Sequence, residues 1–285
     1  MELLNNILYP LFVFVGLGAA MGIMLAIASK VFAVKTDERV EKIVDVLPGA
    51  NCGGCGYAGC NALAEAVVKG EAKCSGCIVG GDAVAAKVAE IMGVAAGSTE
   101  RMRAQVMCSG TSEYAKKKYV YDGVQDCIAA AKMGGGDKLC PNGCIGLGTC
   151  TRACPFGAIS VKNGVAVVDY RKCKGCGVCI TACPKHIIRL IPYESRHWVG
   201  CMSVDDGKTT RKYCDVGCIS CRLCEKNCEA GAITVSDYVA KIDYSKCNGC
   251  DVCITKCPRK IIWSSKSQGD GLVIVRVDPE IPAKA

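Results

Sequence analysis

The chain has 285 residues, 25 of them cysteine, and carries a formal net charge of +8. This length predicts two or more domains, and a chain of this size does not need disulfides to replace a missing core. Its two histidines, His186 and His197, are too few for histidine-rich zinc sites to be a general theme. The composition therefore excludes a small disulfide-stapled protein, and the odd number of cysteines also argues against complete pairing.

A long apolar run opens the chain, with no charged residue between Glu2 and Lys30. Residues 7–28, ILYPLFVFVGLGAAMGIMLAIA, are enough to cross about 30 Å of hydrocarbon as a helix. A cleaved signal peptide is the alternative, with AIA at 26–28 as the cleavage site. However, the preceding MELLNN carries no positive side chain. We therefore predict a retained transmembrane anchor over residues 1–30.

Positive charges follow this segment, at Lys30, Lys35 and Arg39, and none precedes it except the chain terminus. The positive-inside rule then predicts a single pass through the cytoplasmic membrane, with the remaining chain on the cytoplasmic side. Thiols stay reduced in that compartment, so the many cysteines indicate metal ligation rather than disulfides.

Beyond residue 138 the sequence repeats a cysteine motif. Residues 168–188, VDYRKCKGCGVCITACPKHII, match residues 242–262, IDYSKCNGCDVCITKCPRKII, and both contain C-x2-C-x2-C-x3-C-P. A looser copy precedes each block, over 140–154 and 218–228, and Glu229 stands where the other three copies have proline. The pattern predicts two tandem domains, at 139–192 and 193–285.

The spacing of these motifs suits four-iron clusters. Three cysteines at i, i+3 and i+6 hold three irons of a cube, and the fourth, which we expect to start a short helix, reaches the other cluster of the pair. The predicted ligand sets are Cys140, Cys144, Cys150 with Cys183; Cys173, Cys176, Cys179 with Cys154; Cys218, Cys221, Cys224 with Cys257; and Cys247, Cys250, Cys253 with Cys228.

Zinc ribbons are the alternative interpretation, but they use two separated C-x2-C pairs rather than four cysteines in one run. Five or six clusters would add roughly −10 to −12 of charge to the protein. The formal positive charge therefore does not indicate a nucleic-acid partner.

With these motifs, the chain resembles the B subunit of the Rnf electron-transport complexes, which are membrane-bound, ferredoxin-linked oxidoreductases. The resemblance covers an anchor, the CGGCGYAGC module at 52–60 and two ferredoxin-type pairs, the form found in anaerobes. It implies a single-cluster domain over 31–95, with a helix after Gly81. Val79 stands where the family often has proline, and Cys74 competes for the fourth ligand position. The implied ligands are Cys52, Cys55, Cys60 and Cys77.

Further cysteines lie outside these sets. We hypothesise that four of them form a sixth site, with Cys74 unliganded and residues 96–138 a connecting segment; the alternative is that they are buried free thiols. The four are Cys108, Cys127, Cys201 and Cys214.

The predicted fold class is α+β, made of small iron–sulfur modules. One N-terminal transmembrane helix precedes a helical four-iron domain and two tandem 2[4Fe-4S] ferredoxin-like domains, which together hold five or six [4Fe-4S] clusters. No nucleophile–base arrangement is visible, so no catalytic residue is assigned.

The resemblance implies an electron-relay component of an ion-translocating ferredoxin:NAD+ oxidoreductase. Its implied partners are soluble ferredoxin, integral membrane subunits and a flavin- and NADH-binding subunit. The alternatives are a polyferredoxin that serves a hydrogenase or another dehydrogenase, and a zinc-bound membrane scaffold.

Overall fold

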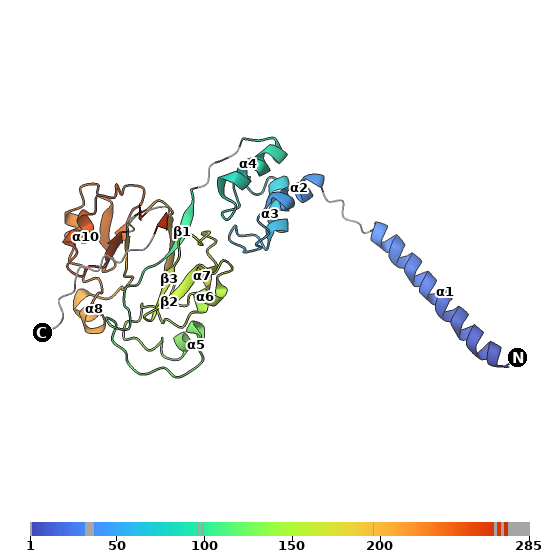
Figure 1. Cartoon of the computed structure of the whole chain (residues 1–285), viewed down its shortest axis with the longest axis horizontal. Coiled ribbons are helices and arrows are strands. Elements are labelled where there is room, and N and C mark those ends of the chain that lie inside the picture. The colour runs from blue at the N-terminus through green and yellow to red at the C-terminus, as the bar shows by residue number, and fades with distance from the viewer. Residues whose placement is uncertain are drawn as a thin grey trace.

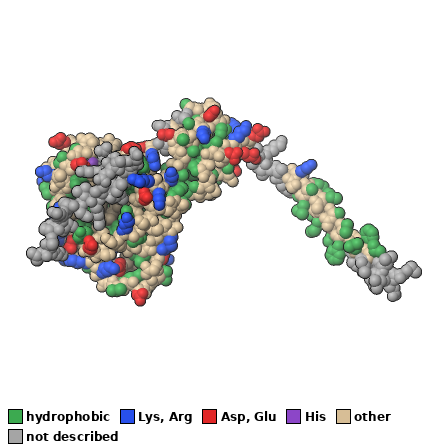
Figure 2. Space-filling model, viewed as in Figure 1, with side chains coloured by type: hydrophobic (Ala, Val, Ile, Leu, Met, Phe, Trp, Pro, Cys, Tyr) green, Lys and Arg blue, Asp and Glu red, His purple; other side chains and the backbone are tan. Residues whose placement is uncertain are grey.

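A computed structural model describes residues 2–31, 37–95, 97, 100–195, 197–264, 267–268 and 271–272. Its first element is the 30-residue helix α1 (Glu2–Val31), which contains the predicted anchor. The stretch Leu11–Lys30 has a mean hydropathy of 2.5, and none of it is buried. Figure 2 shows hydrophobic side chains along this helix. By length and composition α1 suits a membrane span.

Three helices form the single-cluster module. They are α2 (Glu38–Val46), α3 (Cys60–Val68) and α4 (Gly81–Met92). Their inward faces share a core that includes Ile43, Leu63 and Val88. The helix expected after Gly81 is confirmed as α4. It ends at Gly93, whose left-handed φ of 68° favours glycine.

The first ferredoxin-like unit contains two antiparallel strand pairs. β2 (Ile159–Lys162) pairs with β3 (Val165–Val168), and β4 (Ile188–Pro192) pairs with β1 (Met102–Val106). Its helices are α5 (Cys127–Lys132), α6 (Thr149–Ala153) and α7 (Val178–Ala182). The unit therefore begins at β1, inside the stretch that the sequence predicts to be a connecting segment.

The second unit repeats this arrangement. β6 (Ile233–Ser236) pairs with β7 (Val239–Ile242), and β5 (His197–Val199) pairs with β8 (Ile262–Ser264). Its helices are α8 (Gly207–Tyr213), α9 (Leu223–Lys226) and α10 (Val252–Lys256), and the short pair β9 (Ser267–Gln268) and β10 (Gly271–Leu272) follows. Figure 1 shows the two units side by side.

The short helices correct one expectation from the sequence. The spacing predicts that the fourth cysteine of a motif starts a helix, and this is wrong, because the helix ends there instead. Cys154, Cys183 and Cys257 are the C-caps of α6, α7 and α10, with extended ψ angles of 110–111°. A residue that precedes proline is driven from helical to extended backbone, so the helix must stop before it.

A buried arginine lies between the two units. Arg103, on β1, is 0% exposed, and its guanidinium carbon lies 3.7 Å from the ring centre of Tyr170 and 5.9 Å from that of Trp198. The guanidinium also donates to the backbone oxygens of Tyr193 and Ser195, at 3.3 and 2.6 Å. Since Tyr170 belongs to the first unit and Trp198 to the second, this one side chain contacts both.

Replacing Arg103 with methionine tests this junction. Methionine keeps much of the apolar bulk but leaves two backbone oxygens without a donor, so we expect a loss of about 2–4 kcal/mol in unfolding free energy. The measurement is the urea midpoint of the far-ultraviolet circular dichroism of the full chain. Arg39→Met is the matched control, because the Arg39 side chain is 47% exposed and, among the described residues, its ion pair is with the neighbouring Asp37. Equal midpoints for the two variants would contradict the assignment.

Candidate iron–sulfur sites

Twenty-four cysteines fall into six groups of four, called sites A to F below. Site A is the set that the family resemblance implies, Cys52, Cys55, Cys60 and Cys77, and the structure places the last three close together. Site B is Cys154, Cys173, Cys176 and Cys179. Site C is Cys127, Cys144, Cys150 and Cys183, and site D is Cys108, Cys140, Cys201 and Cys214. Site E is Cys218, Cys221, Cys224 and Cys257, and site F is Cys228, Cys247, Cys250 and Cys253. Cys74 is left over and packs against the core of the helical module.

Sites B, E and F contain the cysteine sets predicted from the repeats. In each, three thiols come from one loop and its short helix, and the fourth comes from the other half of the unit. Cys257, for example, lies beside Cys218 and Cys224, across the unit from its own loop. Site A contains the four cysteines that the family resemblance implies, and Cys77 lies near Cys55 and Cys60.

Sites C and D differ from the predicted sets, because Cys127 and Cys140 exchange places. Cys127 lines a cavity with Cys144, Cys150 and Cys183, whereas Cys140 lines another with the remaining cysteines of site D. The structure thus brings together neither the predicted set of Cys140 with Cys183 nor that of Cys127 with Cys108.

When the two looser motifs are aligned without gaps, the sequence indicates why Cys127 and Cys140 exchange places. CPNGCIGLGTCTRACP at 140–155 and CDVGCISCRLCEKNCE at 214–229 have equal length. Cys140 then matches Cys214, and the two are the first cysteines of their segments. The position of Cys221 is held by Leu147 in the first unit, so one ligand of site C must come from elsewhere.

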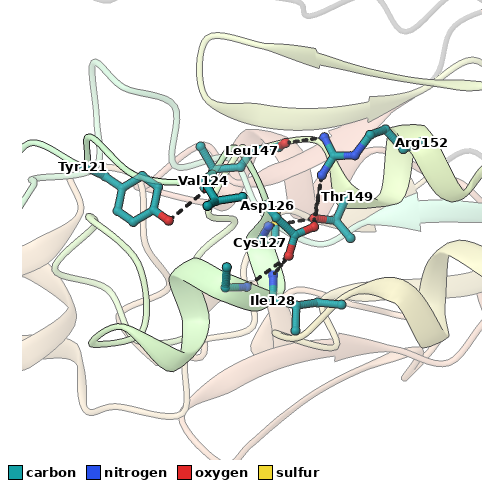
Figure 3. A network of polar contacts seen from close by, with 9 residues as sticks. Tyr121, Val124, Asp126, Cys127, Ile128, Leu147, Thr149 and Arg152 are labelled. Atoms are coloured by element: carbon teal, nitrogen blue, oxygen red, sulfur yellow. Dashed lines mark hydrogen bonds and ion pairs between the residues drawn. The ribbon is translucent and has the colours of Figure 1, made fainter.

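Asp126 fixes the position of Cys127, the cysteine that site C gains from outside the looser motif (Figure 3). Asp126 caps α5 by accepting from the backbone nitrogens of Ile128 and Ala129, at 2.8 and 3.0 Å. Its carboxylate also accepts from Thr149 at 2.8 Å and from Arg152 at 3.0 Å. These hydrogen bonds lower the pKa of Asp126, with the backbone bond from Ala129 as the largest cause.

Thr149 completes this anchor. Its hydroxyl oxygen accepts from the backbone nitrogen of Cys127 at 2.7 Å, and Arg152 donates to the backbone oxygen of Leu147 at 3.2 Å. The start of α5 is thereby fastened to α6, the helix that carries Cys150. These hydrogen bonds hold Cys127 at the cavity of site C, where Leu147 has no thiol to contribute.

The thiols in these sites are poorly suited to ionise unaided. Burial, followed by repulsion from neighbouring thiolates, raises the pKa to about 12 for Cys144, Cys179 and Cys253. Without a nearby cation such thiols stay protonated near neutral pH. A metal centre that binds thiolates supplies the compensating positive charge, so the donor chemistry fits a metal cofactor.

The described thiols are not arranged tightly around a single point. Among the described residues, no group of three or more His, Cys, Asp and Glu side chains is close enough to hold one metal ion. Thiolates around a single zinc ion lie about 3.8 Å apart, since each is about 2.3 Å from the metal. A four-iron cube takes one thiolate at each separate iron, so its ligands surround a larger space.

Backbone amides point at several of the sulfurs. Such hydrogen bonds stabilise negative charge on a ligand and raise the reduction potential of a cluster. The donors occupy equivalent positions in the two units: Ala158 to Cys154 at 3.4 Å and Ala232 to Cys228 at 3.3 Å. A strand from the supposed connecting segment also takes part, since Ala104 of β1 donates to Cys173 at 3.4 Å.

The helical module contacts the first ferredoxin-like unit at a cysteine loop. A Cβ atom on Gly54 would lie 2.5 Å from the backbone oxygen of Cys176, so only glycine allows this approach. Cys52 of site A is near enough to Cys176 of site B to add to the pKa-raising effect of burial there. Sites A and B are therefore direct neighbours.

Two family models match the chain. One, described as a putative Fe-S cluster, matches residues 47–79, which include all of site A. The other, described as a 4Fe-4S dicluster domain, matches residues 142–187 and 217–261, one segment in each ferredoxin-like unit.

Curated relatives align over most of the chain. The B subunit of the ion-translocating oxidoreductase complex of Methanosarcina acetivorans is 43% identical over 251 residues, or 88% of this chain and 95% of that protein. The B subunit of the Na+-translocating ferredoxin:NAD+ oxidoreductase complex of Acetobacterium woodii is 48% identical, over 94% of this chain and 80% of that protein. The B subunit of the proton-translocating ferredoxin:NAD+ oxidoreductase complex of Clostridium ljungdahlii is 42% identical, over 94% and 95% respectively.

Changing Cys127 to alanine tests the composition of site C. We expect the anaerobically purified full chain to lose about four irons, because the cube of site C is deprived of one of its four thiolate ligands. Cys74→Ala is the matched control and is expected to change nothing, since Cys74 belongs to no site. Iron and acid-labile sulfide are measured per chain. An unchanged iron content in Cys127→Ala would show that Cys127 is a buried free thiol.

Changing Gly54 to alanine tests the contact between sites A and B. The added methyl group overlaps the backbone oxygen of Cys176, so we expect faster amide hydrogen exchange in residues 52–60 and 173–179 of the full chain. Gly18→Ala is the control, because Gly18 lies in helix α1 and a Cβ atom there meets nothing within 4 Å. Equal exchange in both variants would contradict the contact.

Proposed function

Since the chain belongs to the family of B subunits of ion-translocating, Rnf-type oxidoreductase complexes, we propose that it is the electron-relay component of such a complex. The observation that carries this proposal is that thiols of neighbouring cysteine sites lie close enough to influence one another electrostatically. Cys52 of site A neighbours Cys176 of site B, and Cys150 of site C neighbours Cys179 of site B. An electron relay needs its cofactor sites close to one another, whereas a scaffold does not.

The residues proposed to hold [4Fe-4S] clusters are the cysteines of sites A, B, C, E and F. When bound, each cluster gains one electron and passes one on, and no bond is made or broken at the protein. The chain supplies the thiolates, the backbone donors that tune the cluster, and a small-residue lining that brings neighbouring sites close. It contributes no substrate-transforming residue, in keeping with a relay.

The electron donor we propose is reduced soluble ferredoxin, as the names of two relatives indicate for their own complexes. Two reduced ferredoxins supply one electron each, and two electrons with one proton convert NAD+ to NADH on a flavin- and NADH-binding partner protein. Cys221 and Cys250 are the exposed cysteines among the described residues. Their exposure supports sites E and F as the entry for a soluble donor.

Site A supports the opposite end of the path, because its module follows the membrane helix in sequence. Helix α1 is proposed to anchor the chain beside the integral subunits of the complex. Lys30 lies in the last turn of this helix, toward the cysteine-bearing part of the chain, which by the positive-inside rule is the cytoplasmic side.

The metal content of the full chain, purified anaerobically from membranes, tests the relay. We expect at least about 20 irons per chain and a visible absorbance that both dithionite and reduced ferredoxin bleach. Stoichiometric zinc without bleaching would instead support a zinc-bound scaffold.

Co-purification separates the remaining alternative. Integral membrane and flavin-binding subunits are expected to accompany the full chain and to be lost when residues 1–30 are deleted. Recovery of hydrogenase subunits in their place would make the chain a polyferredoxin of another redox complex.

A further inference from the structure

We propose that site D binds a sixth [4Fe-4S] cluster, which joins the two ferredoxin-like units into one electron path. This inference rests on the proposed function and extends it to four cysteines outside every matched family segment. The segments end at 187 and begin again at 217, and none includes Cys108, Cys140, Cys201 or Cys214. All four line one cavity, between α8 and the loop before α6.

Site D is shared equally by the two units. Cys108 lies two residues after β1, which ends at Val106, and Cys201 lies two residues after β5, which ends at Val199. Cys140 and Cys214 likewise hold equivalent positions at the start of the two looser motifs. Each unit thus contributes two thiols from matching places, and neither forms the site alone. Unrelated buried thiols would not be expected to converge in this way.

Hydrogen bonds connect site D to the sites on either side. The backbone nitrogen of Cys144, a site C residue, lies 3.5 Å from the sulfur of Cys108. In the other unit, the backbone nitrogen of Cys218, a site E residue, lies 3.4 Å from the sulfur of Cys201. The same type of bond therefore leads from the shared site into each unit.

Cationic side chains lie beside this site and would offset part of the roughly −2 charge of a thiolate-ligated cube, although the carboxylates of Asp205 and Asp215 lie near it as well. Lys138 is only 4% exposed, lines the cavity and donates to the backbone oxygen of Gly110 at 2.7 Å. Arg259 donates to the backbone oxygen of Cys214 at 2.8 Å. Lys185, at the equivalent position after Cys-Pro in the first unit, donates to the backbone oxygen of Pro141 at 2.8 Å.

Site D completes the order of the path. Neighbouring thiols link A to B, B to C, C to D through Cys144 and Cys108, and D to E through Cys201 and Cys218. Cys224 and Cys253 then link E to F. Without site D, the first unit and the second unit would be separate relays. With it, electrons cross the interface in single steps between adjacent sites.

Iron counting on the anaerobically purified full chain tests this inference. The wild type should contain about 24 irons, and Cys108→Ala, Cys201→Ala and the double variant should each contain about 20, because both residues serve one cluster. The Cys108→Ala, Cys127→Ala double variant should contain about 16, because those residues serve different clusters. Cys74→Ala is the matched control and should equal the wild type.

Each result distinguishes the inference from the proposed function. About 20 irons in the wild type, unchanged by Cys108→Ala, would overturn site D but leave the five-cluster relay intact. About 20 irons in the Cys108→Ala, Cys127→Ala double variant would favour the grouping of Cys127 with Cys108 and overturn the site as assigned here. A wild type without iron would overturn the proposed function itself.

A second measurement guards against misfolding. Alanine at 108 or 201 cannot ligate iron, so low-temperature electron paramagnetic resonance of each reduced alanine variant should show one spin fewer than in the wild type. Retention of the spins of the other clusters shows that the chain is folded. An unchanged spin count in both alanine variants, with iron also unchanged, would again overturn site D.

Discussion

A four-iron cube takes one thiolate at each of four corners, and this requirement shapes most of the structure. A loop with cysteines three residues apart reaches three corners, so the fourth thiolate must come from another part of the chain. Cys154 and Cys183 each leave their own loop for the opposite site of the first unit. The hydrophobic cores of both units contain these cysteines among small aliphatic side chains, so metal binding and core formation are coupled.

The same requirement explains how the two units hold together. Arg103 stacks between Tyr170 and Trp198, and Trp263 of the second unit donates to Ser109 of the first at 2.7 Å. Ser109 directly follows Cys108, so the contacts between the units lie beside the thiols that the units share. A junction built only for stability would not need cysteines at equivalent places, whereas a junction that carries electrons does.

Local spacing is sufficient for most of the candidate site. The repeated motifs predict the cysteines of sites B, E and F in the sets that the fold brings together. The helix after Gly81 is also predicted from the sequence. The exchange of Cys127 and Cys140 escapes prediction when the first looser motif is aligned with enlarged gaps. Cys127 reaches site C only through the hydrogen bonds of Asp126 with Thr149 and Arg152, which join segments more than 20 residues apart.

The sequence by itself determined the apolar helix, the tandem motifs and the helix after Gly81, because each depends on residues close together in the chain. Tertiary structure alone decided that Cys127 rather than Cys140 joins site C, that β1 pairs with β4, and that Cys108, Cys140, Cys201 and Cys214 meet between the units. Motif spacing describes one loop at a time. The meeting of loops depends on strand pairing and on packing across the interface, which no local pattern records.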